Sequence, residues 1–100
     1  MTASRGELRI ARVLSRLSEI RALRIAHQIG DEHGRTVRVL LSRDRHKTVI
    51  HARHQLWTVV RHTLNLSYPE LAELFEVDHT TVLYAVHKRE GELAHEYRPA

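Results

Sequence analysis

The sequence predicts an all-α fold of five or six helices, and three observations support this prediction. Apolar residues recur every three or four positions along most of the chain, which is the spacing of one helix face. The chain has one Phe, one Trp, four glycines and two prolines, so aromatic-rich strands and frequent turns are not expected. Its 100 residues suit one core of modest size, so we expect one main domain.

The first helical stripe runs over residues 7–29. Its apolar positions are spaced by three and four residues: Ile10, Val13, Leu17, Ile20, Leu23, Ala26 and Ile29. Ser15 and Ser18 are positions at which this stripe could divide into two helices.

A shorter helix is expected next, because Gly30 and Gly34 can end the helix before it. The stretch TVRVLL alternates like a strand, but a single short strand would have no partner in this chain. We therefore predict that Thr36 caps a helix over residues 37–42 and that a basic loop, SRDRHK at residues 42–47, follows it.

The second half of the chain contains the clearest local signals. Apolar spacing predicts a helix from about Thr48 to Asn65, with Trp57 on its flank. Ser67 and Glu70 then have the spacing of a capping box, with Pro69 in the first turn, where its missing N–H costs nothing.

Asp78 is a preferred capping residue and opens the last helix. Two short helices joined by a tight turn form a helix-turn-helix, which needs a small residue where the helices cross and buried residues that hold their angle. Ala72, Val77 and Val82 occupy these positions. Glu76 lies in the turn, where glycine is often used for its positive φ.

Charge favours an anionic partner. Sixteen Lys and Arg against twelve Asp and Glu give a formal charge of +4, and Lys47 and Lys88 are the only lysines. Arginine suits bidentate contact with phosphates. Without cysteine the chain has no disulfide or thiol nucleophile, and no apolar run approaches the roughly 20 residues that span a bilayer. We expect a cytoplasmic protein.

The stretch DHTTVLYA, residues 78–85, resembles the signature of the DNA-binding domain IV of the bacterial replication initiator DnaA. Three further segments resemble the same family in order: LLSRDRHK, VIHARHQLWTVVRHTLNLS and SYPEL. The resemblance implies a helix-turn-helix domain over residues 18–95, with a helical extension at 1–17 and a tail at 96–100. The four glycines form no phosphate-binding loop, so the likeness is to the DNA-binding domain without the ATPase.

The resemblance also implies which residues contact double-stranded DNA. Base contacts are expected from the start of the last helix: Asp78, His79, Thr80 and Thr81. Minor-groove contacts are expected from the basic loop: Arg43, Arg45 and Lys47. Phosphate contacts are expected from four more residues: Arg53, Arg61, Ser67 and Lys88.

Two departures from the family affect the site. Lys47 stands where the family has an arginine, and lysine lacks the planar fork that fits a narrow groove. The turn FEV is one residue shorter than the family's glycine-rich turn. The preferred DNA sequence is therefore expected to differ from that of the family.

Several alternatives stay open from the sequence. Asp78 can be a helix cap alone or a cap that also contacts a base, and the basic loop can be a solvated connection. Arg9, Arg12 and Arg16 form one face of the first helix, which can be solvated, contact phosphates or lie beside an interface for self-association. Nine histidines suggest metal binding, but His51 and His54 have no third ligand at a fixed spacing, so we expect no metal and no cofactor.

The function predicted from these residues is sequence-specific DNA binding that regulates replication initiation or transcription, with replication-initiation proteins as possible partners. The second hypothesis is a protein-interaction module that binds a replication regulator and whose DNA contact is vestigial. A helical nuclease ranks third, and we expect no enzymatic activity.

Overall fold

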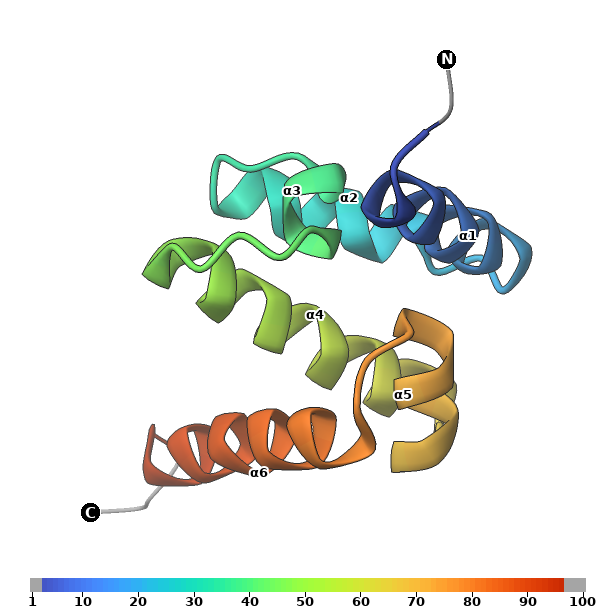
Figure 1. Ribbon diagram of the computed structural model, residues 1–100. Coiled ribbons are helices and arrows are strands. Elements are labelled where there is room, and N and C mark those ends of the chain that lie inside the picture. The colour runs from blue at the N-terminus through green and yellow to red at the C-terminus, as the bar shows by residue number, and fades with distance from the viewer. Residues whose placement is uncertain (1–2, 97–100) are drawn as a thin grey trace.

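The computed structural model describes residues 3–96, with side chains up to residue 91, and this part of the chain contains six helices and no strand. The all-α prediction is confirmed. Figure 1 shows α4 in the middle, with α1, α2 and α3 on one side and α5 and α6 on the other. The helices are α1 (Arg5–Glu19), α2 (Leu23–Glu32), α3 (Val37–Leu41), α4 (Lys47–Leu64), α5 (Tyr68–Phe75) and α6 (His79–Glu96).

The first apolar stripe is divided into two helices, but not at the serines. Ser15 and Ser18 lie within α1, and the chain turns at Arg21, whose φ is 61°. The N–H of Ala22 donates to the carbonyl of Leu17 at 2.8 Å, which closes the end of α1 as left-handed helix ends commonly do. The break therefore follows the serines and depends on backbone geometry that apolar spacing does not reveal.

The connection from α2 to α3 depends on two glycines. Gly34 has a φ of +64°, which glycine adopts without strain, whereas Gly30 lies inside α2. A Cβ on Gly30 would lie 2.5 Å from the backbone oxygen of Arg35. The predicted cap is confirmed, because the N–H of Val39 donates to the Thr36 hydroxyl at 3.3 Å.

α4 lies at the centre of the core. Leu56 and Val60 are fully buried, and Trp57 is only 4% exposed, with its ring centroid 6.2 Å from that of Phe75. Trp57, which was predicted on the flank of the apolar stripe, is buried because α4 is covered on several sides. None of the described helices is long and apolar enough to cross a membrane.

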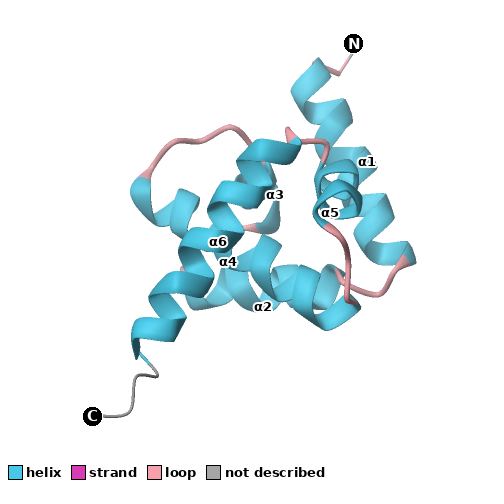
Figure 2. Ribbon diagram, turned by 90° about the horizontal axis from the view of Figure 1, so that it is seen from below, coloured by secondary structure: helices cyan, strands magenta, loops and turns pink. Residues whose placement is uncertain are grey.

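The helix-turn-helix consists of α5 and α6, and Figure 2 shows α6 lying across α4. The capping box is confirmed: the N–H of Glu70 donates to the Ser67 hydroxyl, and the N–H of Ser67 donates to the Glu70 carboxylate. Ala72 is 6% exposed and Val82 is fully buried, as the motif requires, while Val77 is partly buried against the core. The packing fixes α6 against both α4 and α5.

Candidate nucleic-acid interface

Asp78 caps α6. Its Oδ1 accepts hydrogen bonds from the backbone N–H of Thr80 at 2.9 Å and from the Thr80 hydroxyl at 2.6 Å, and its carbonyl accepts from the N–H of Val82. These bonds, the side-chain bond to Thr80 first, lower the pKa of Asp78. Asp78 is therefore a carboxylate at neutral pH, with one oxygen committed to the cap.

The four residues predicted to contact bases are all exposed at the start of α6. The Thr80 hydroxyl uses its proton in the bond to Asp78, so it presents lone pairs and a methyl group to a partner. His79 and Thr81 make no side-chain hydrogen bond within the described part of the chain and keep their full capacity. The first turn of α6 thus offers both donors and acceptors to a groove.

The basic loop between α3 and α4 has a defined shape. The N–H of His46 donates to the Asp44 carboxylate at 2.8 Å, and the N–H of Asp44 donates to the Ser42 hydroxyl at 3.2 Å. Arg53 of α4 donates to the carbonyl of Leu40 at 2.8 Å and to that of Asp44 at 2.9 Å. Burial lowers the pKa of Arg53, although the nearby Asp44 opposes this effect.

The structure brings this loop to the start of α6. Arg43, Arg45 and Arg53 line a hollow of about 440 Å³ together with Asp78 and Thr81. Arg43 and Arg45 are exposed, whereas Arg53 is half-buried and points at backbone carbonyls. This hollow, which we call the arginine hollow, places residues predicted to contact bases beside arginines predicted to contact the minor groove or phosphates.

The prediction that Lys47 lies in the basic loop was wrong. Lys47 is the first residue of α4 and lines a second hollow of about 310 Å³ with Lys88, Arg89, His51 and His54. Lys47 and Lys88 are 41 positions apart in the sequence, and the packing of α6 against α4 brings them together. Of the predicted cations, Arg43, Arg45 and Arg53 thus line the arginine hollow beside Asp78 and Thr81, whereas Lys47 and Lys88 line the second hollow.

Arg61 and Ser67 both have partners within the chain. The guanidinium of Arg61 lies 4.1 Å from the centre of the Tyr68 ring, and its Nη1 is 3.6 Å from Glu90. Ser67 is occupied in the capping box. Both residues have a structural role, and their contact with phosphate stays a prediction, as it does for Arg53.

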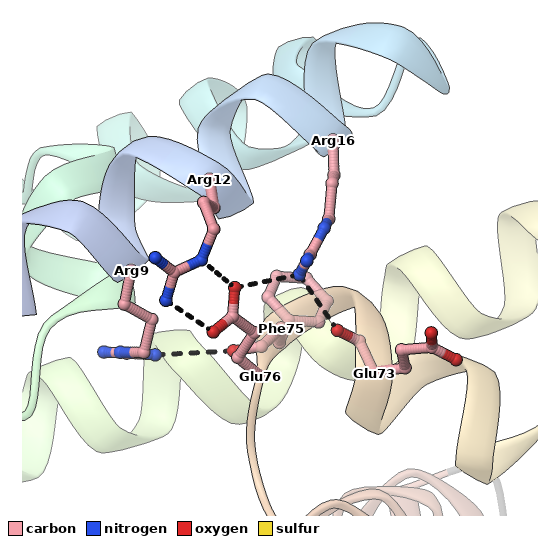
Figure 3. A network of polar contacts seen from close by, with 6 residues as sticks. All are labelled: Arg9, Arg12, Arg16, Glu73, Phe75 and Glu76. Atoms are coloured by element: carbon pink, nitrogen blue, oxygen red, sulfur yellow. Dashed lines mark hydrogen bonds and ion pairs between the residues drawn. The ribbon is translucent and has the colours of Figure 1, made fainter.

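Sequence reasoning missed the contacts of Glu76, the turn residue between α5 and α6. As expected, this residue has a positive φ, of 52°. Its carboxylate receives two hydrogen bonds from Arg12 of α1, at 2.8 and 2.9 Å, and one from Arg16 at 3.0 Å (Figure 3). The bond from Arg12 is the main cause that lowers the pKa of Glu76.

Arginines of α1 also bond to backbone at the same place. Arg16 donates to the carbonyl of Glu73 at 3.2 Å, and Arg9 donates to that of Phe75 at 3.4 Å (Figure 3). Arg9 additionally donates to the carbonyl of Leu41. We call Arg9, Arg12 and Arg16 the arginine clamp. In the sequence, the arginine clamp could be recognised only by the shared helix face of its three arginines. That spacing does not indicate which residues they contact.

No group of three or more His, Cys, Asp or Glu residues is arranged to hold a metal ion in the part of the chain that the structure describes.

A family model described as the bacterial DnaA protein helix-turn-helix matches residues 23–88. The chain belongs to this family. The DnaA helix-turn-helix is a non-catalytic domain that binds double-stranded DNA, and the matched residues include the basic loop and the start of α6. Comparisons with curated proteins and with solved structures gave no match. The matched residues begin at α2, so α1 and its arginine clamp lie outside them.

Proposed function

We propose that this chain binds double-stranded DNA at specific sequences and regulates replication initiation or transcription. The N-terminal turn of α6 enters the major groove, and the basic loop reaches the adjacent minor groove. The observation that carries the proposal is the arginine hollow, where Asp78 and Thr81 of the DnaA-like motif share one face with Arg43 and Arg45.

The exposed groups suit the edges of base pairs. The carboxylate oxygen of Asp78 that is free of the cap can accept from a cytosine amine, and the Thr81 methyl can pack against a thymine methyl. His79 can donate or accept, according to its tautomer. The Thr80 hydroxyl donates its proton to Asp78 and so offers only lone pairs to DNA. We therefore expect Thr80 to face a hydrogen-bond donor or a phosphate-bound water.

The surrounding charges suit the DNA backbone. Arg43, Arg45, Lys47 and Lys88 are all exposed, and the first turn of α6 adds the positive end of its helix dipole. About five phosphate contacts would give a slope of roughly −4 to −5 in log K against log salt concentration. Replication-initiation proteins remain possible partners in this proposal.

Selection of bound duplexes from a random library tests the proposal directly. We expect one enriched sequence, and His79→Ala should weaken binding to it by about 1–3 kcal/mol. His27→Ala is a matched control, because His27 is an exposed histidine on α2, distant in sequence from the motif. A protein that enriches no sequence and shows no salt slope would instead favour the protein-interaction module.

A further inference from the structure

The arginine clamp joins α1 to the turn from which α6 starts, and we infer that α1 positions the recognition helix for DNA binding through Arg12 and Arg16, which hold Glu76. This inference rests on the proposed DNA binding. It assigns a role to a helix that lies outside the residues matched by the family model. Arg12 and Arg16 are positioning residues here and need no contact with DNA.

The turn residue needs to be held. Glu76 has φ 52° and ψ 49°, a left-handed conformation that is strained for a residue with a Cβ. The paired hydrogen bonds from Arg12 are charge-assisted and approach both carboxylate oxygens, a geometry that restricts direction as well as distance. Two residues later Asp78 caps α6, so the geometry of Glu76 sets the direction in which α6 leaves the turn.

The clamp also satisfies the end of α5. The last carbonyls of a helix have few partners within it, and that of Phe75 receives a hydrogen bond from Arg9. The carbonyl of Glu73 accepts from the N–H of Glu76 and receives a second hydrogen bond from Arg16. Arg9 reaches the carbonyl of Leu41 as well, where α3 ends and the basic loop begins. A single helix thus contacts two of the segments that line the arginine hollow, the start of the basic loop and the turn before α6.

Direct contact between Arg12 and a phosphate is the competing explanation, because the side chain of Arg12 is 52% exposed. The two explanations predict opposite effects of removing Glu76. Loss of a negative charge near DNA strengthens binding if only charge matters. Loss of the residue that the clamp holds weakens specific binding if α1 acts through the turn.

The test is a double-mutant cycle in the full chain with Arg12→Gln, Glu76→Ala and the double variant. Glu76→Ala removes the carboxylate but keeps a Cβ at the left-handed position. Binding to the selected duplex should weaken about three- to tenfold in each single variant, and the double variant should be no weaker than either. The control is Arg5→Gln, since Arg5 is exposed on the same helix and makes no ion pair among the described residues.

The salt slope provides a second readout. A positioning residue leaves the slope unchanged, whereas loss of one phosphate contact reduces it by about 0.9. The inference is overturned if Glu76→Ala strengthens specific binding, or if Arg12→Gln weakens binding equally with and without Glu76 and also lowers the slope.

Hydrogen exchange without DNA separates this inference from the proposed function. The N–H of Val77 bonds to the carbonyl of Ala72 at 3.0 Å, and that of Thr80 bonds to Asp78. Both amides should exchange faster in Arg12→Gln and Glu76→Ala than in Arg5→Gln, beyond the change in global stability from urea unfolding. Unchanged exchange overturns the positioning role alone. A parent protein that binds no duplex overturns the proposed function, and with it any role of α1 in DNA binding.

Discussion

Replacing Asp78 separates its capping from its contact with DNA. Asp78→Ala removes the oxygen that binds the N–H and hydroxyl of Thr80, and loss of a helix cap costs about 1 kcal/mol. For a domain of this size that corresponds to a fall in Tm of roughly 4–8 °C. Asp78→Asn keeps an acceptor at the same position and loses only the charge at the helix N-terminus, which contributes about 0.3–1 kcal/mol at low salt and less when screened.

Binding should rank the same variants differently. If the second oxygen of Asp78 accepts from a cytosine amine, Asp78→Asn loses a charge-assisted bond and should weaken binding to the selected duplex by about 1 kcal/mol, or change the preferred base. Non-specific binding should not fall, because a negative charge near DNA has been removed. The assay is titration of the selected and a scrambled duplex at one salt concentration, beside thermal unfolding of each variant.

One result would refute this reasoning about DNA. If Asp78→Asn and Asp78→Ala both bind the selected duplex as the parent does, while only Asp78→Ala unfolds more easily, then Asp78 is a helix cap and nothing more. Loss of binding in proportion to loss of stability would point to the same conclusion.

Three further predictions follow from the geometry. In urea unfolding, Gly91→Ala should stabilise the protein by about 0.5–1 kcal/mol because its Cβ meets nothing within 4 Å, whereas Gly30→Ala should destabilise it by about 1–2 kcal/mol because its Cβ meets the Arg35 carbonyl. Equal effects would contradict the close approach at Gly30. The lowered pKa of Glu76 means that its stabilising contribution is present above the ordinary pKa of 4.5 and is lost as the pH falls through its folded value. The difference in unfolding free energy between the parent and Glu76→Gln should therefore shrink from pH 7 toward pH 2, and a constant difference would exclude this linkage. Lys47→Ala should weaken binding most on duplexes with A·T-rich flanks, measured by titration, if it reads groove shape, and equally on all flanks if it contacts a phosphate.

Local signals in the sequence predicted the helix starts well. Thr36, Ser67 and Asp78 each cap a helix through bonds to residues two or three positions away, so the interacting groups appear together in the sequence. The positive φ of Glu76 was also anticipated from its place in the motif. Such features depend on backbone geometry within one turn.

Long-range features could not be predicted in this way. Arg12 and Glu76 are 64 positions apart, and nothing near either residue indicates the other. Likewise Lys47 joins Lys88 only because α4 and α6 pack against each other. The burial of Trp57 depends on how many helices pack against α4, and the spacing of apolar residues does not indicate that number. The DNA contacts themselves remain predictions from the family resemblance and the exposure of the residues.

The bonds that Arg53 makes to Leu40 and Asp44 have a thermodynamic consequence for recognition. They fix the backbone of the basic loop in the free protein, so the conformational entropy of that loop is lost during folding and not on encounter with a partner. Ordering a side chain or loop at an interface commonly subtracts about 0.5–1.5 kcal/mol per group from affinity. A preorganised loop avoids that loss, so Arg53 can strengthen binding without touching the ligand. This contribution is entropic, and calorimetry of Arg53→Gln would reveal it as a less favourable entropy of binding.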